Sequence, residues 1–292
     1  MDSQTQPFDS RQYWNERLSA HADKEGVGSS DTPPFLADLM YNARMRQVER
    51  VLRRLKLKNL KEKSILDVGS GTGIWLEFWR RHGANRVAGL EFSDPGVRML
   101  RAKFPDALIV QADLRAPHFS MPNDTKFDVV SAFEVLLHVV TPEEFDHSIA
   151  NLASWCKPGG WLVISDPITF GNGYVPPRQQ VSYMTVRPMA ELRHALPAHG
   201  FEILSAGPTT VLLNAPLEGA NKAIYKMSRI WWRVWITAAR KSSRSPRLAW
   251  THSKWLISVI SAALLGLDAI ACRLWPRSRA PTSKLIVARK VS

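Results

Sequence analysis

The glycine-rich segment Asp67–Gly73 (DVGSGTG) is the feature that most constrains how this chain can fold. It follows a short apolar run, Ser64–Val68, and leads into an amphipathic stretch, Trp75–His82, so it predicts a tight turn from a strand into a helix. Glycines at alternate positions permit that turn and let a ligand approach the backbone, while the unpaired N–H groups at the start of the helix favour an anionic or polar ligand. Dinucleotide-binding proteins use similar turns, so the turn alone does not identify the ligand.

Apolar runs continue to alternate with amphipathic stretches after this turn. Further runs lie at Arg86–Leu90, Ala107–Gln111, Phe127–Ala132 and Trp161–Ser165. Continuous apolar runs are typical of strands buried on both faces, and their alternation with helices predicts an α/β fold with a mostly parallel sheet and helices on both faces. Two helices, at about Ser10–His21 and Pro34–Leu55, are expected before the first strand.

Two acidic residues follow the glycine-rich segment at the ends of predicted strands. Glu91 ends the second strand, where a carboxylate can accept hydrogen bonds from both hydroxyls of a ribose. Asp113 follows the third strand, where it can accept a hydrogen bond from an adenine amino group or, alternatively, cap a helix. The spacing therefore favours a ligand that contains adenosine.

The segments DVGSGTG, AGLEFSD, QADL, FDVVSAFEVLLHV and KPGGWLVISD resemble, in order and spacing, the class I S-adenosylmethionine-dependent methyltransferases, and above all their small-molecule group. The resemblance covers about 63–205, with Lys284–Lys290 as the last strand. It implies a Rossmann-like seven-stranded sheet whose last strand is antiparallel, with S-adenosyl-L-methionine as the cofactor. It also implies ribose contact by Glu91, adenine packing by Phe92 and adenine hydrogen bonding by Asp113. The cofactor-binding residues implied are Asp67, Gly69, Ser70, Gly71, Gly73, Glu91, Phe92, Asp113, Leu114 and Phe133.

Glu134 and His138 are the predicted catalytic residues. They are four residues apart, so both could face the cofactor from one helical turn. A histidine there could take the proton of an attacking hydroxyl, because its unperturbed pKa is about 6.5. Purely structural roles remain open for both residues. Substrate contacts are expected from Asp166, Tyr183 and Arg187, in or beside a connection at about 167–193 that is expected to form a substrate lid.

Positive charge and tryptophan are concentrated in one late stretch of the chain. The net charge is +13, and between Lys222 and Arg279 twelve basic residues accompany a single acid, Asp268, and six of the eleven tryptophans. Four of the basic residues recur at helical spacing beside an apolar face, which predicts a basic amphipathic helical insertion before the last strand. These four are Lys222, Lys226, Arg229 and Arg233.

This pattern predicts four parts of the chain. Residues 1–60 form N-terminal cap helices, 61–215 the cofactor-binding core, 216–280 the basic insertion and 281–292 the final strand. Within the cap, Tyr13-Trp14 and 42–46 are expected either to cover the cofactor or substrate or simply to pack. No metal site is predicted, and two cysteines, Cys156 and Cys272, are too few for a disulfide scaffold or a cysteine-built zinc site.

The stretch Trp255–Cys272 is eighteen residues long and carries one charge, Asp268. This is the low edge of a membrane-spanning length, an aspartate at mid-membrane costs about 2.5–3.5 kcal/mol, and the next strand must rejoin the sheet. We therefore expect interfacial helices whose basic residues meet anionic lipid, rather than a spanning helix. Packing on the protein's own sheet, packing on a second copy, and nucleic-acid binding are the alternatives.

The sequence therefore predicts an enzyme that methylates a small or lipid-linked acceptor by direct in-line transfer. O-methylation of a sugar or isoprenoid-type molecule is favoured, by a cytoplasmic protein peripheral to the membrane. The polar, acidic N-terminus is not typical of a secretory signal. The absence of an Asn/Asp-Pro-Pro-aromatic segment and of a Pro-Cys pair disfavours nucleic-acid bases as acceptors. An RNA or DNA methyltransferase that uses the basic insertion, a non-catalytic cofactor-binding scaffold, and a homo-oligomer remain open.

Overall fold

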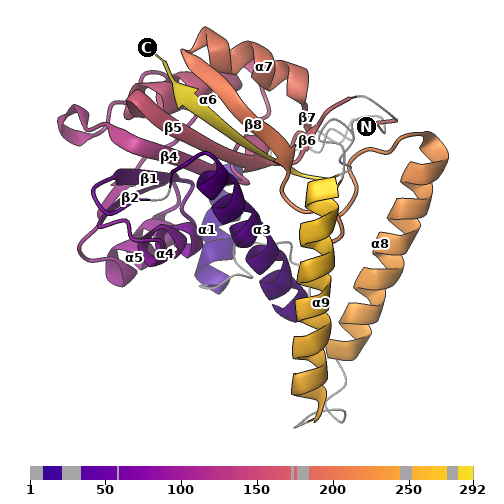
Figure 1. Cartoon of the computed structure of the whole chain (residues 1–292). Coiled ribbons are helices and arrows are strands. Elements are labelled where there is room, and N and C mark those ends of the chain that lie inside the picture. Colours follow the sequence, from indigo (N-terminus) through magenta and orange to yellow (C-terminus); the bar gives the residue numbers. More distant parts are fainter. Residues whose placement is uncertain are drawn as a thin grey trace, which may run out of the picture.

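A seven-stranded sheet forms the centre of the molecule (Figure 1). The computed structural model describes residues 9–21, 34–57, 59–171, 174–175, 184–243, 252–274 and 282–291. The strand order is β3-β2-β1-β4-β5-β9-β8, and β9 runs antiparallel to both of its neighbours while β1 to β5 are parallel. This confirms the predicted Rossmann-like sheet with an antiparallel last strand. The strands are β1 (Ser64–Val68), β2 (Arg86–Glu91), β3 (Leu108–Gln111), β4 (Phe127–Phe133), β5 (Cys156–Asp166), β8 (Phe201–Pro208) and β9 (Lys284–Lys290), with a separate small pair, β6 (Ile168–Thr169) and β7 (Arg187–Pro188).

Helices cover both faces of the sheet, as predicted, because the strands are apolar on both sides. One face carries α6 (Pro142–Trp155) and α7 (Met189–Ala198), and the other carries α3 (Pro34–Arg54), α4 (Ile74–Arg81) and α5 (Asp94–Lys103). The described residues also form α1 (Ser10–Ala20), which contacts α5, and the long pair α8 (Lys222–Ser243) and α9 (His252–Leu274) that leaves the body. Short 3-10 turns lie at Pro122–Asp124 and Leu136–His138.

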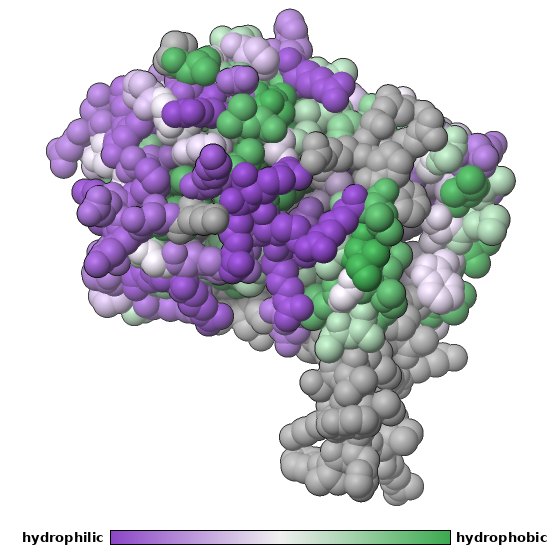
Figure 2. All heavy atoms as spheres, viewed as in Figure 1, coloured by the Kyte–Doolittle hydropathy of each residue, from purple (hydrophilic) through white to green (hydrophobic). Residues whose placement is uncertain are grey.

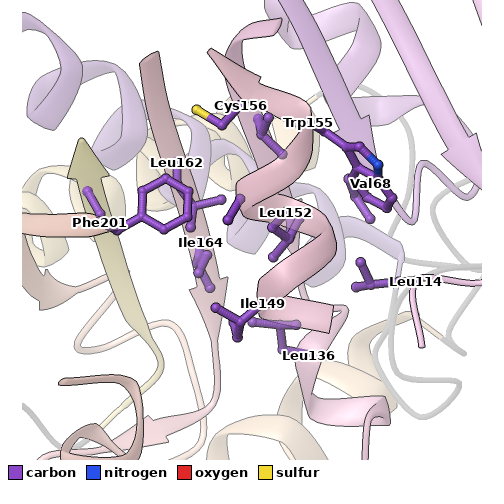
Figure 3. Close-up of a cluster of buried hydrophobic side chains, with 14 of the residues drawn as sticks. Val68, Leu114, Leu136, Ile149, Leu152, Trp155, Cys156, Leu162, Ile164 and Phe201 are labelled. Atoms are coloured by element: carbon purple, nitrogen blue, oxygen red, sulfur yellow. The ribbon is translucent and has the colours of Figure 1, made fainter. Parts of the chain in front are cut away.

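One buried tryptophan packs between helix and sheet on each face of the sheet. On one face Trp155 of α6 is buried in the cluster of Figure 3, and its indole N–H donates to the carbonyl of Phe119 at 2.9 Å. On the other face the fully buried Trp79 of α4 donates to Ser131 Oγ at 3.0 Å. Each large ring fills space between helix and sheet while its one polar group is satisfied, so neither leaves an unpaired donor in the core.

The segment Lys157–Gly160, whose proline and glycines are typical of a turn, forms a bulge inside a longer strand. Phe127 of β4 pairs with Cys156, and Val129 pairs with Trp161, so 157–160 project from the ladder. Gly159 adopts φ +71°, and a Cβ at Gly160 would lie 2.8 Å from Cys156 Sγ and from the carbonyl oxygen of Lys157. The glycines permit this crowding, and the sequence signal for a turn was in fact the signal for a bulge.

A buried ion pair holds the base of the α8–α9 pair. Lys284 Nζ of β9 lies 3.0 Å from Glu218 Oε1, and both side chains are buried. Glu218 also accepts hydrogen bonds of 3.0 Å from the backbone N–H groups of Phe170 and Gly171. Burial lowers the pKa of Lys284 to about 8, against the opposing effect of Glu218. The pair thus joins the loop after β6, the segment before α8 and the start of the last strand.

The second half of α9 packs on the body, and its aspartate takes part. Asp268, 3% exposed, accepts hydrogen bonds from the N–H groups of Val211 at 2.8 Å and Leu212 at 2.6 Å. One turn earlier Leu265 packs with Leu36 and Leu39 of α3. The single charge of Trp255–Cys272 therefore satisfies backbone donors within the protein. Among the residues that the structure describes, no helix is long and apolar enough to cross a membrane.

Replacing Glu218 tests the ion pair. Glu218→Gln removes the carboxylate that pairs with the buried Lys284 ammonium, and we expect the free energy of unfolding to fall by about 3–5 kcal/mol in urea titrations. The matched control is Glu49→Gln, which breaks the exposed Glu49–Arg53 pair and is expected to cost less than about 1 kcal/mol. Equal losses in the two variants would contradict a structural role for the buried pair.

Candidate functional site

A pocket opens at the edge of the sheet where the parallel strands β1, β2, β3 and β4 end. Its empty volume is about 960 Å³, part of which is open to solvent. Side chains of α1 and α3, Trp14 and Tyr41 among them, complete the wall. Of the N-terminal residues expected to cover the site, Trp14 lines the pocket, whereas Tyr13 and 42–46 do not. The predicted residues that line the pocket are Gly69, Ser70, Gly71, Glu91, Phe92, Asp113, Leu114, Phe133, Glu134 and His138.

The glycine-rich turn has a conformation that requires its glycines. Gly69, Gly71 and Gly73 all have positive φ, at +67°, +51° and +80°. A Cβ at Gly69 would lie 2.5 Å from Val135 Cγ2, and one at Gly73 would lie 2.4 Å from Phe104 Cε2. Gly73 does not line the pocket; it allows the turn to pass close to the end of α5 and so fixes the loop that does.

The carboxylate of Glu91 organises the adjacent edge of the pocket. Oε2 accepts from the N–H of Gly71 at 2.9 Å, and Oε1 accepts from Phe92 at 3.0 Å and Ser93 at 2.9 Å. A carboxylate offers about four acceptor positions, so three backbone donors leave capacity for a ligand hydroxyl. Glu91 thus fits the ribose contact that the resemblance implies, and it also holds the loop in place.

Asp67 lies beneath the turn rather than in the pocket wall. Its Oδ1 accepts from Ser131 Oγ at 2.8 Å, whereas Oδ2 is buried with no hydrogen-bond partner among the described residues. Burial raises the pKa of Asp67 to about 7, although hydrogen bonds from Ser131 and Ser70 oppose the shift. Thr72 Oγ1, in the same turn, is also buried without a partner. Thr72 lines the pocket and Asp67 does not, so the Thr72 hydroxyl is the one of these two groups that a polar ligand fits.

Asp113 is paired with an arginine that the sequence analysis did not single out. Arg115 donates to both carboxylate oxygens, Nη2 to Oδ2 at 2.7 Å and Nε to Oδ1 at 2.9 Å. Burial would raise the pKa of Asp113, but Arg115 outweighs burial and the pKa is lowered. The guanidinium carbons of Arg115 and Arg11 lie 5.9 and 5.4 Å from the centre of the Phe92 ring. A carboxylate, an aromatic ring and two cations therefore gather where adenine is expected.

The opposite end of the pocket is shaped by a second ion pair. Arg44 Nη1 of α3 lies 2.7 Å from Glu134 Oε2, and burial, which would lower the pKa of Arg44, is outweighed by Glu134. Glu134 has φ +58°, a strained conformation, and its N–H donates to the carbonyl of Ser165 at 2.7 Å. The guanidinium also lies over the ring of Tyr41, whose pKa burial raises, so Tyr41 stays neutral.

His138 reaches the same end from a different element. It ends the 3-10 turn Leu136–His138, and its ring lies edge-on to Trp14 of α1 with 5.2 Å between centroids. Glu134 and His138 do line one pocket, but they do so from a strand end and a 3-10 turn rather than from one face of a helix. The sequence analysis placed both residues on one helical turn. They line the same pocket, but no α-helix connects them.

The expected substrate residues Asp166 and Arg187 lie behind the pocket and do not line it. Asp166 Oδ1 accepts from the N–H of Leu137 at 3.2 Å, and burial raises the pKa of this carboxyl well above its usual range. Arg187 donates to the carbonyls of Leu136, at 2.6 Å, and Val139. Both therefore support the turn that carries His138, and their contact with substrate stays a prediction. Tyr183 lies outside the described residues.

The raised pKa of Asp67 has a measurable consequence. The folded protein keeps this proton to about pH 7, whereas an unfolded aspartic acid loses it near pH 4, so the stabilisation present below about pH 4 is lost as the pH rises to about 7. We expect wild-type stability to fall by a few kcal/mol more than that of Asp67→Asn between pH 4 and pH 7. Urea unfolding of both proteins across this range measures it, and parallel pH profiles would contradict the assignment.

Comparisons with known proteins agree with this geometry. A family model described as a methyltransferase domain matches residues 41–206, more than half of the chain. The chain is 36% identical over 116 residues, 38% of this chain and 47% of the relative, to dTDP-3-amino-3,4,6-trideoxy-alpha-D-glucopyranose N,N-dimethyltransferase of Streptomyces venezuelae. It is 29% identical over 141 residues, 41% of this chain and 43% of the relative, to the mitochondrial ubiquinone biosynthesis O-methyltransferase of Dictyostelium discoideum.

The chain thus spans less than half the length of these two curated relatives. A solved complex between the Haloferax volcanii Trm112 methyltransferase activator and the methyltransferase shares the fold, with a TM-score of 0.54, 17% identity, and coverage of 95% of this chain and 97% of that one. The matched family model includes the glycine-rich turn, Glu91, Asp113 and Glu134. The chain therefore belongs to the methyltransferase-domain family, among the class I S-adenosylmethionine-dependent methyltransferases.

Proposed function

We propose that this protein transfers a methyl group from S-adenosylmethionine to a small or lipid-linked acceptor, most readily to an oxygen of a sugar or isoprenoid-type molecule. The observation that carries the proposal is the division of the pocket. The turn and Glu91 form an adenosine-type end, and on the other side of β1 the Arg44–Glu134 pair and His138 form a second polar end. A pocket with two such ends can hold a cofactor at one end and an acceptor at the other.

Residues at the first end would hold the cofactor. Glu91 would accept hydrogen bonds from ribose hydroxyls, Phe92 would pack on the adenine, and Asp113, oriented by Arg115, would accept from its amino group. When bound, S-adenosylmethionine supplies a methyl group made electrophilic by the sulfonium. The protein's contribution is alignment of the acceptor and exclusion of water.

Residues at the second end would align the acceptor. Trp75 stacks on Phe133 with 3.6 Å between ring centroids, which gives this part of the pocket an apolar wall. Against that wall His138 would accept the proton of an acceptor hydroxyl, since histidine titrates near neutral pH. The Arg44–Glu134 pair offers both a cation and an anion for positioning. A base beside the acceptor favours a hydroxyl as the methylated group.

The helix α8 supports action at a membrane surface. Met227, Ile230, Trp231 and Val234 lie on one side of it and are 58–68% exposed. The basic row Lys222, Lys226, Arg229 and Arg233 runs beside them, and Figure 2 shows hydrophobic side chains on the outside of the α8–α9 pair. Apolar side chains bordered by cations fit the interface of an anionic membrane. A peripheral position on the cytoplasmic face would give the pocket access to a lipid-linked acceptor.

The cofactor end is tested by Glu91→Gln. Loss of the charged acceptor is expected to weaken S-adenosylmethionine binding by roughly 10–100-fold in isothermal titration calorimetry. The control is Asp106→Asn, which neutralises an exposed carboxylate paired with Arg80 outside the pocket and is expected to leave the affinity unchanged. Thermal unfolding of both variants verifies folding. Unchanged affinity in a folded Glu91→Gln protein would contradict the cofactor assignment.

The membrane surface is tested with vesicles. The triple variant Lys226→Gln/Arg229→Gln/Arg233→Gln is expected to weaken sedimentation with anionic vesicles by roughly 100-fold, at about 1 kcal/mol for each cation near the lipid. The control, Lys61→Gln/Arg98→Gln/Lys126→Gln, removes three exposed cations from the body and is expected to bind almost as wild type. Wild-type protein that stays in the supernatant, or equal loss in the two variants, would contradict the proposal. Dimerisation without vesicle binding would assign the α8 face to a second copy.

A further inference from the structure

We infer that the cavity between α3, β8 and the end of α9 is a second binding site, for a phosphate or diphosphate group. It lies outside the pocket proposed for methyl transfer, and the two share no lining residue. Its empty volume is about 870 Å³, part of it open to solvent. The inference does not depend on the proposed function.

Three arginines from two elements converge on this cavity. Arg50 and Arg54 come from α3, and Arg273 comes from the last turn of α9. No acidic side chain is found among the described residues that line it. Asp268 of α9 lies directly behind the wall and is not part of it: its Oδ1 accepts from the N–H groups of Val211 and Leu212, and its Oδ2 accepts from Sγ of the lining residue Cys272 at 3.6 Å. The cavity therefore concentrates positive charge.

Neutral partners orient two of these guanidinium groups. Gln47 Nε2 donates to the carbonyl of Pro208 at 3.1 Å, and its Oε1 accepts from Arg50 Nη1. Arg54 Nη2 donates to Ser205 Oγ at 2.8 Å. An amide and a hydroxyl fix the direction of a guanidinium without cancelling its charge. The amide of Gln47 and the hydroxyl of Ser205 thus direct these two guanidinium groups.

The chemistry of the donors points to phosphate oxygens. A guanidinium is a planar fork that matches the oxygens of a phosphate, and its donors cannot be removed by deprotonation. Like charges gathered around a cavity repel one another, and a multiply charged anion relieves that repulsion. Val51 and Leu285 give the same cavity an apolar side that can contact the carbon portion of an ester. A phosphate or diphosphate ester fits the cavity because its anionic oxygens can contact the arginines and its carbon portion can contact Val51 and Leu285.

Helix α3 contributes to both sites. Arg44 reaches the first pocket, and Arg50, six residues later and about 9 Å further along the helix axis, reaches the second. The phosphate group has two candidate sources. One is a phosphate ester whose length spans both sites, and the other is a lipid headgroup beside α9. The shared chemistry is the phosphate group, and the experiment separates its sources.

The test is calorimetric titration of the full chain with inorganic pyrophosphate at fixed ionic strength. Wild type is expected to bind saturably, and Arg50→Gln and Arg273→Gln are each expected to bind at least about tenfold more weakly. The matched control is Arg53→Gln, which removes an exposed arginine of the same helix that pairs with Glu49 and does not line the cavity. Its affinity is expected to stay within about twofold of wild type. No saturable binding, or equal weakening by Arg53→Gln, would overturn the inference.

Two further measurements locate the source of the phosphate and check the fold. If Arg50→Gln also weakens binding to vesicles of phosphatidic acid, and pyrophosphate competes with them, the site takes a lipid headgroup. If vesicle binding is unchanged while pyrophosphate binding is weakened, the site takes a soluble phosphate ester. In both cases S-adenosylmethionine affinity is expected to equal that of wild type, which separates this site from the first pocket and shows that the variant is folded.

Discussion

The carboxylate of Glu91 is the contact on which the cofactor end of this structure depends. It joins the end of β2 to the glycine-rich turn after β1 and to the turn before α5, through three backbone hydrogen bonds. Because β1 and β2 are parallel neighbours, their carboxyl ends meet, and a single side chain can hold both loops at the mouth of the pocket. The loop positions that border the pocket, Gly69 to Thr72, are thereby set by a residue twenty positions away from the turn it holds. The Glu91 carboxylate therefore both holds the loops at the mouth of the pocket and keeps an acceptor position for a ligand.

The turn and the acids at this end of the site could be predicted because their signals are local, whereas Arg115, the partner of Asp113, was not predicted. The turn needs glycines where φ is positive, and the acids follow strands whose apolar runs are unmistakable. The other end was harder to predict. Arg44 meets Glu134 from ninety residues away, and nothing in the helical pattern of α3 distinguishes it from Arg50 or Arg53. Asp166 and Arg187 were predicted to contact substrate, and the structure adds that Asp166 Oδ1 and the two Nη atoms of Arg187 bond to the backbone of the turn that carries His138.

In the basic insertion, too, local sequence patterns predict the helices but not the contacts between residues that are distant in the sequence. Its helices and its amphipathic character follow from spacing within 222–274, and both are present. The contacts that attach the insertion to the body do not follow from this spacing. Glu218, before the insertion, pairs with Lys284 after it, and Asp268 of α9 accepts hydrogen bonds from the N–H groups of Val211 and Leu212. In the sequence, the charge of Asp268 counted against a membrane-spanning helix, and in the structure the same carboxylate holds the helix to the body. Charged residues with distant partners are where prediction from one sequence fails.

The central claim is that this pocket methylates a small or lipid-linked acceptor. Its most direct test is incubation of the protein with S-adenosylmethionine labelled in the methyl group and a cell extract that contains membranes, followed by fractionation. We expect label in the organic-soluble or glycolipid fraction, and less label with Glu91→Gln when the cofactor concentration is near the wild-type dissociation constant. Label in nucleic acid would contradict it in favour of an RNA or DNA methyltransferase. Tight cofactor binding with no label in any fraction would contradict it in favour of a non-catalytic scaffold.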